Sequence, residues 1–107
     1  MEIKANKLTI EQNIARIQEW AGAVGIYEHS NPQAQALKAV SEMGEVADAI
    51  IKRDLAGLED GIADVMVCLV NLAFMSGIDF ADAFSKVTDE VTARRGRMVT
   101  GGAFVKE

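Results

Sequence analysis

The stretch DGIADVMVCLVNLAFMSG, residues 60–77, decides the fold class of this chain. Residues 65–70 within it are all apolar, and at ~100° per residue they surround a helix on every side. We therefore expect a helix that is buried on nearly all sides. The apolar run is short for a membrane span and is interrupted by Asp64 and Asn71, so a buried helix is the better interpretation.

The composition of the whole chain favours further helices around that segment. The 107 residues include a single proline and few β-branched runs at period two, whereas Ala, Leu, Glu, Lys and Met are plentiful. Half of the chain is hydrophobic but only 6% is aromatic, so the core must be aliphatic and rich in methionine. We predict one all-α domain over residues 1–107, built as a four-helix bundle.

Capping residues and glycines divide the chain into four predicted helices. Thr9 and Gln12 match a capping box. Pro32 suits the first turn of a second helix, capped by Ser30 or Asn31. Asp79 suits the cap of a fourth helix, in which Phe80, Phe84, Val87 and Val91 face inward. The expected helices run from residue 10 towards the glycines at 22 and 25, over 32–53, over 58–76 and over 80–95, with a polar connector at 27–31 and an irregular tail at 96–107.

Two pairs of carboxylates lie at helical spacing on the second and third helices. Glu42 and Glu45 are ~60° apart around one helix axis. Asp60 and Asp64 are ~40° apart around the next. Two packed helices can therefore bring four acidic groups to one point, where a hard divalent cation with oxygen ligands would neutralise them. We interpret the cluster as a magnesium site, and hence as phosphate chemistry, because no Cys or His lies near it to suggest zinc or a di-iron centre.

The residues around this cluster also have structural interpretations. The second helix has an apolar stripe at positions 37, 40, 44, 47 and 51 and a mixed-charge stripe on which Lys38 and Glu42 can form a surface ion pair. Asn71 lies two turns from Asp64 on the same face, as either a satisfied core amide or a ligand contact. The single cysteine, Cys68, is expected to be a small buried hydrophobe, and it leaves no partner for an intrachain disulfide.

The segment SEMGEV at 41–46, followed after a spacer by DGIADVM at 60–66, resembles the MazG-like all-α nucleotide pyrophosphohydrolases. The signature of that family is Glu-x-x-Glu, a spacer, then Glu-x-x-Asp. The similarity extends from residue 19 to the tail at 94–98 and is greatest to short, single-domain members from phages and bacteria. The resemblance implies magnesium-dependent cleavage of a nucleoside triphosphate between its α and β phosphates, which gives the monophosphate and pyrophosphate.

This chain departs from the family signature at two positions. Gly61 stands where the signature has glutamate, and Ser41 replaces a frequent extra acid before the first motif. Asp60 is four residues before Asp64 on the same helix face, so we expect Asp60 to replace the missing ligand. The resemblance implies that Glu42, Glu45, Asp60 and Asp64 hold Mg²⁺, with Mn²⁺ as an alternative ion, and that Glu42, Glu45 or the metal itself activates the attacking water.

Cationic and aromatic residues complete the predicted site. Two lysines flank the acidic pair on the mixed-charge stripe, and an arginine group precedes a glycine-containing tail that can fold over a nucleotide. Trp20 can stack on a base, although its place in the apolar stripe of the first helix also suits the core. The predicted substrate contacts are Lys38, Lys52, Asn71, Arg94, Arg95, Arg97 and Trp20.

Charge and hydropathy limit the partners that this chain can take. The net charge is −5 and no basic cluster exceeds three residues, which argues against a duplex nucleic acid. Residues 1–8 lack the apolar core of a signal peptide, so we expect a cytoplasmic protein without a membrane partner. An apolar helix in so small a chain needs more cover than three short partners provide, so we expect a homodimer or homotetramer.

Two other classes of function stay open at this point. A non-catalytic helical assembly or regulatory protein can keep the acidic cluster to bind metal or nucleotide without turnover, and the departures at Gly61 and Ser41 favour it. A purely structural bundle would carry the carboxylates as surface ions. That class predicts that Mg²⁺ leaves the melting temperature unchanged, because only a ligand of the native state raises it.

Overall fold

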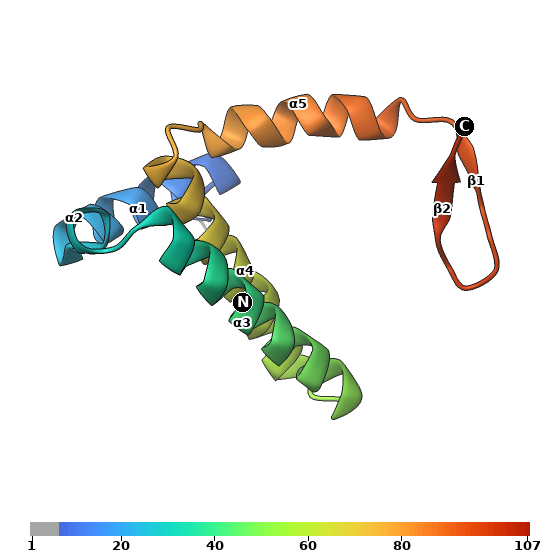
Figure 1. The fold of residues 1–107 in the computed structure, drawn as a ribbon, viewed down its shortest axis with the longest axis horizontal. Coiled ribbons are helices and arrows are strands. Elements are labelled where there is room, and N and C mark those ends of the chain that lie inside the picture. The colour runs from blue at the N-terminus through green and yellow to red at the C-terminus, as the bar shows by residue number, and fades with distance from the viewer. Residues whose placement is uncertain (1–6) are drawn as a thin grey trace, which may run out of the picture.

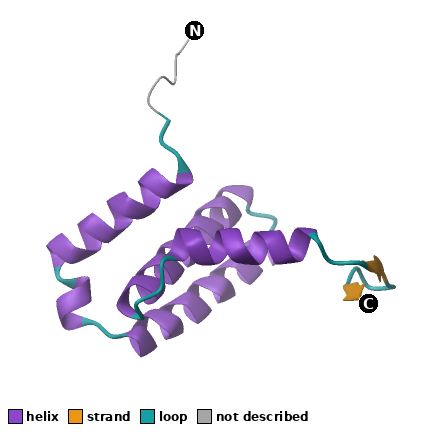
Figure 2. Cartoon of the chain, turned by 90° about the horizontal axis from the view of Figure 1, so that it is seen from above, coloured by secondary structure: helices purple, strands orange, loops and turns teal. Residues whose placement is uncertain are grey.

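The computed structural model describes residues 7–107, which are mostly helical (Figure 1). Their elements are α1 (Ile10–Val24), α2 (Ile26–His29), α3 (Pro32–Ile51), α4 (Leu55–Met75), α5 (Phe80–Thr92), β1 (Gly96–Met98) and β2 (Phe104–Lys106). The predicted all-α class is confirmed. The long helices α3 and α4 lie side by side, α1 packs against α4, and α5 leads away to a small hairpin (Figures 1 and 2).

Three predicted helix caps form where the sequence places them. The N–H of Thr9 donates to Oε1 of Gln12 at 2.9 Å, and the N–H of Gln12 donates to Oγ1 of Thr9 at 3.1 Å. These reciprocal bonds are a capping box. The side chains of Asn31 and Asp79 cap α3 and α5 by accepting a backbone N–H three residues on, at 2.8 and 3.0 Å.

Some helix boundaries differ from the prediction for local reasons. The connector expected at 27–31 contains α2, because Gly25 adopts a φ of 90° and its carbonyl accepts the N–H of His29 at 2.9 Å. α4 begins at residue 55 rather than near 58, because Asp54 accepts the N–H of Gly57 at 2.9 Å and caps the helix there. α3 and α5 end at residues 51 and 92, slightly before the expected 53 and 95.

Small residues allow α3 and α4 to approach closely. Ala39, Val46 and Ala49 of α3 are buried, and so is Gly61 of α4. A Cβ atom built on Gly61 would lie 2.9 Å from Cγ2 of Val46, so only glycine fits this crossing point without movement of its neighbour. This pair of helices forms the largest interface in the described chain, and it sets the position of the carboxylates.

α4 is only partly covered by the rest of the chain. Cys68, Val70 and Asn71 are buried, which confirms the interpretation of Cys68 as a small buried hydrophobe. Ile62 and Leu69 are 58% and 39% exposed, so the expectation of burial on nearly all sides is wrong for the single chain. The apolar stripe of α3 also faces outward, because α4 packs on the face of small residues beside it; its exposed members include Leu37, Val40 and Ile51.

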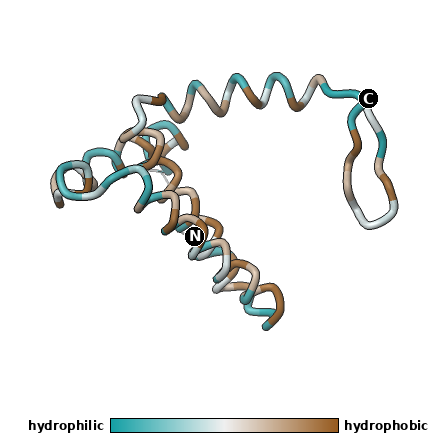
Figure 3. The backbone as a smooth tube through the Cα atoms, viewed as in Figure 1, coloured by the Kyte–Doolittle hydropathy of each residue, from teal (hydrophilic) through white to brown (hydrophobic). Residues whose placement is uncertain are grey.

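α5 and the hairpin form an arm that extends away from α3 and α4 (Figure 1). Phe84, Val87 and Val91 were expected to face inward but are exposed, since only the first turn of α5 packs near α1 and α4. Figure 3 shows apolar and polar residues alternating along this helix. The tail, expected to be irregular, forms an antiparallel hairpin, in which Gly101 and Gly102 take φ values of 99° and 90° to make the turn.

Two further predictions concern the membrane and the amino terminus. Among residues 7–107, no single helix is both long and apolar enough to cross a membrane. Only α4 and α5 taken together are long and apolar enough, and these two helices are bent by 110° relative to each other. The prediction that residues 1–8 are not a signal peptide falls mostly outside the described residues.

Candidate metal centre

An open cavity of about 380 Å³ lies along the groove between α3 and α4. Each helix contributes two carboxylates to its lining, and the cap residue of α4 contributes a fifth. Lys52 is the one cationic residue among its lining residues, so the cavity is strongly anionic and attracts cations. The acidic residues that line it are Glu45, Asp48, Asp54, Asp60 and Asp64.

Glu42 completes the acidic group at one end of the cavity. This residue is half-buried, and its Oε2 atom is shielded from solvent without a hydrogen-bond partner. The pKa of Glu42 is raised above its ordinary value, first because the neighbouring Glu45 carboxylate favours the protonated form, and next because of burial. The negative charges of Glu45 and Asp64 raise this pKa further, and the charge of Lys38 opposes them. Glu42, Glu45 and Asp64 therefore act on one another electrostatically.

The carboxylates surround the cavity rather than converge on one point within it. Among residues 7–107, no three Asp, Glu, Cys or His side chains stand close enough together to hold one ion between them. Glu45, Asp48 and Asp60 are exposed, and repulsion between like charges favours rotamers that keep them apart.

Two acidic residues of the cavity were missed from the sequence. Asp48 follows Glu45 by three residues, so the helical spacing used for the predicted pairs would also have found it. Asp54 precedes the expected start of its helix and carries a capping signal instead. Its Oδ1 atom accepts the N–H of Gly57, so part of its hydrogen-bonding capacity already serves the helix.

The structure does not bring Asn71 to the cavity. Its side chain is 2% exposed, and its Oδ1 atom accepts a hydrogen bond of 2.7 Å from the hydroxyl of Tyr27. The ring of Tyr27 stacks on Phe74 with 4.1 Å between the centroids, and burial raises the pKa of the Tyr27 phenol. Asn71 therefore links α2 to α4, in agreement with the alternative of a satisfied core amide.

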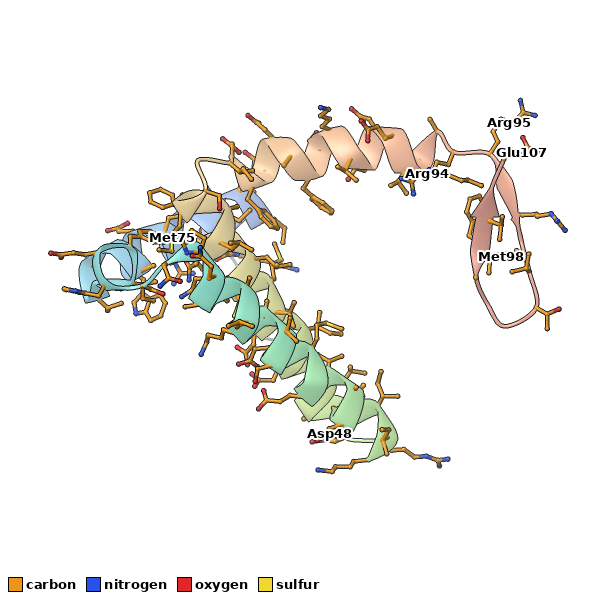
Figure 4. All side chains as sticks on the ribbon, in the orientation of Figure 1. Asp48, Met75, Arg94, Arg95, Met98 and Glu107 are labelled. Atoms are coloured by element: carbon orange, nitrogen blue, oxygen red, sulfur yellow. The ribbon has the colours of Figure 1, made fainter. Side chains whose placement is uncertain are left out.

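Of the other predicted substrate contacts, Lys52 lines the cavity, whereas the rest lie apart from it within one chain. Lys38 is exposed and acts on Glu42 only through its charge. Trp20 is 52% exposed and lines a separate cavity on α1 with Asn13, Arg16 and Ile17. Figure 4 shows Arg94 and Arg95 at the far end of the arm from Asp48, and Arg97 follows them on β1.

Comparison with known proteins identifies the family of this fold. A family model described as the MazG nucleotide pyrophosphohydrolase domain matches residues 30–99, which include all four predicted metal ligands. The chain belongs to the MazG family. This assignment confirms the resemblance found in the sequence.

Two further proteins are similar to this chain. An uncharacterised 18.2 kDa protein from the rep–hol intergenic region of Haemophilus phage HP1 (strain HP1c1) is 34% identical over 70 residues, or 65% of this chain. The match spans 43% of the length of that relative. A cyanophage S-2L MazG-like pyrophosphohydrolase, bound to dGDP and three catalytic Mn²⁺ ions per active site, matches with a TM-score of 0.67 over 94% of both chains. At 23% sequence identity, this structural likeness shows a shared fold, which is the predicted MazG-like one.

Proposed function

We propose that this chain is a Mg²⁺-dependent nucleoside triphosphate pyrophosphohydrolase that cleaves between the α and β phosphates. The observation that carries the proposal is the anionic cavity between α3 and α4, where both halves of the MazG acidic signature meet. Membership of the MazG family supports the same activity, and the nucleotide and Mn²⁺ ions bound by the cyanophage relative support the choice of substrate class and metal. The products would be a nucleoside monophosphate and pyrophosphate.

The residues of the cavity fit a hard divalent cation. Every candidate donor is a carboxylate oxygen, the ligand type that Mg²⁺ and Mn²⁺ prefer. The shielded Oε2 atom of Glu42 has no partner, and a buried anionic oxygen is costly unless a cation or donor satisfies it. Glu42, Glu45, Asp60 and Asp64 would hold the ion. When bound, Mg²⁺ neutralises charge that develops on the phosphate oxygens and lowers the pKa of an attacking water.

The protein side chains then position and deprotonate water. Glu42 or Glu45 accepts a proton from the water, whose oxygen forms a bond to the α-phosphorus. The bond from that phosphorus to the bridging oxygen breaks, and the electron pair leaves with pyrophosphate. Lys52, on the same cavity, is placed to neutralise a phosphate oxygen.

We also propose that the working form is a homodimer or homotetramer. Large apolar side chains are exposed on the four helices α1, α3, α4 and α5, and extended apolar faces of this kind are typical of protein–protein interfaces. Assembly through these faces would bring the arm and α1 of one copy towards another copy. Trp20, Arg94, Arg95 and Arg97 would then reach a nucleotide that they do not approach within one chain.

The glycine at position 61 supports one alternative function, in which the protein binds metal or nucleotide without turnover. The MazG signature has a glutamate at this position, so one ligand expected for catalysis is absent. Pyrophosphate release separates the two functions. A binding protein would show stabilisation by Mg²⁺ and nucleotide but no product.

The experiment measures pyrophosphate released from a panel of ribo- and deoxyribonucleoside triphosphates, with Mg²⁺ and with EDTA. Wild type should release pyrophosphate only with Mg²⁺, and Glu45→Gln should abolish release while helix content is kept. Glu59→Gln is the matched control, because Glu59 is exposed on α4 but does not line the cavity. Full activity of Glu45→Gln, or equal loss in Glu59→Gln, would refute the assigned site.

A further inference from the structure

The packing around residue 61 leaves no room for the glutamate side chain that the MazG signature has at this position. Gly61 is buried, and a Cβ atom at this position would lie 2.9 Å from Cγ2 of Val46 and 3.7 Å from the Cα of Val46. Cγ2 belongs to a short β-branched side chain, which has few rotamers in a helix and cannot swing away easily. At the observed spacing of α3 and α4, the missing carboxylate must come from another position.

The contact between Val46 and Gly61 sets the register of the two helices. Because α3 and α4 run in opposite directions, a step forward along α3 matches a step back along α4. Asp48, two residues beyond Val46, is therefore level with position 59 on α4, one residue before Asp60. Glu42, four residues before Val46, is level with position 65, beside Asp64.

The acidic residues consequently occupy two levels along the groove. Glu42 and Asp64 define the first level, Asp48 and Asp60 define the second, and Glu45 lies between them. The midpoint of Glu42 and Glu45 is ~4.5 Å along the helix from the midpoint of Glu45 and Asp48, at ~1.5 Å per residue. Paired catalytic metal ions are ~3.5–4 Å apart, so this spacing suits one ion at each level.

Within residues 7–107, no ion pair or helix cap explains why Asp48 lines the cavity. The simplest structural role would be an ion pair with Lys52, four residues further along α3. Within residues 7–107, however, no nitrogen atom of Lys52 lies within 4.0 Å of a carboxylate oxygen of Asp48. Asp48 caps no helix there either, unlike Asp54. Its carboxylate is exposed on the wall of the cavity opposite Asp60.

We propose that Asp48 is a metal ligand that, together with Asp60, takes the place of the absent glutamate at position 61. With Asp60 and Glu45 it would hold a second divalent ion in the same cavity as the ion assigned to Glu42 and Asp64. This inference rests on the proposed function, because it assigns a further ligand to the same site.

Binding of Mn²⁺ alone to the full chain tests the inference without reference to activity. Free Mn²⁺ is counted by electron paramagnetic resonance, and affinities are measured by calorimetry. Wild type should bind two ions per chain. Asp48→Ala should keep the first and weaken the second at least ~10-fold, since loss of even an outer-shell partner of a metal costs that much. Asp60→Ala should lose the same second ion.

Asp89→Ala provides the matched control for charge and helix propensity. Asp89 is an exposed carboxylate within α5, away from the cavity, so its removal should leave both affinities at wild-type values. The inference is overturned if Asp48→Ala binds Mn²⁺ like Asp89→Ala, or if wild type binds one ion. Absence of both Mn²⁺ binding and pyrophosphate release in wild type would overturn the proposed function itself, whereas an active wild type with an unaltered Asp48→Ala would overturn only the role of Asp48.

Discussion

The contact between Gly61 and Val46 makes a sharp prediction about stability. Gly61→Ala places a methyl group 2.9 Å from Cγ2 of Val46, closer than carbon atoms pack. Overpacking of this kind costs ~1–3 kcal/mol. Against this, replacement of glycine by alanine inside a helix gains ~1 kcal/mol. The net change for Gly61→Ala should therefore lie between ~0 and ~2 kcal/mol of lost unfolding free energy.

Gly44→Ala separates the packing cost from the helix propensity. Gly44 lies inside α3, and a Cβ atom there would meet nothing within 4 Å, so this variant should gain the full ~1 kcal/mol. The two glycine variants should differ by ~1–3 kcal/mol in urea unfolding followed by circular dichroism. In a Val46→Ala background the clash is removed, and Gly61→Ala should become stabilising.

The control measurement is the protein-concentration dependence of each transition, because Gly44 is exposed and assembly through α3 would alter its environment. Equal stabilisation by Gly61→Ala and Gly44→Ala would refute the close approach of α3 and α4. So would a Gly61→Ala effect that is unchanged by Val46→Ala, since the two residues would then be energetically independent.

Three further predictions concern single residues of the described fold. The raised pKa of Glu42 means that the folded state holds its proton more tightly than the unfolded state, so stability in EDTA should fall as pH rises from about 4.5 through the raised value. Glu42→Gln should flatten that fall in thermal melts, and an unchanged pH dependence would contradict the assigned repulsion. Asp54→Ala should cost ~1 kcal/mol because it removes the cap on α4, whereas Asp54→Asn should cost little; a loss of Mn²⁺ affinity with unchanged stability would instead make Asp54 a ligand. Tyr27→Phe should lower the free energy of unfolding by ~1 kcal/mol, because the hydrogen bond to Asn71 is lost, and it should leave KM unchanged. A raised KM with unchanged stability would instead indicate that Asn71 contacts the substrate.

Local signals explain why most helix starts could be predicted from the sequence. A cap such as Thr9 or Asp79 bonds a backbone N–H three residues away, so the sequence contains every atom that takes part. The expected start of α4 near residue 58 is three residues late, because glycine disfavours a helix, whereas here Gly57 donates the N–H that Asp54 accepts. The hairpin in the tail was missed because its short strands carry no strong periodic pattern.

The acidic residues of the site could be found from spacing alone, but their grouping could not. Glu45, Asp60 and Asp64 line one cavity, and Glu42 lies beside it. Asp48 follows Glu45 at the same three-residue spacing, but only the packing of α3 against α4 shows that it lines the same cavity as Asp60. The roles of these residues as metal ligands stay predictions for the binding experiments above.

The sequence by itself determined the helices, most of their caps and the carboxylate pairs, because each depends on bonds or angles within about one turn of chain. The tertiary structure decided which face of α3 meets α4, because the apolar stripe was the obvious candidate and the small residues were used instead. It also decided that Asn71 accepts a bond from Tyr27, forty-four positions earlier in the chain. Such contacts join residues far apart in sequence, so their energies depend on the packing of whole helices rather than on local pattern.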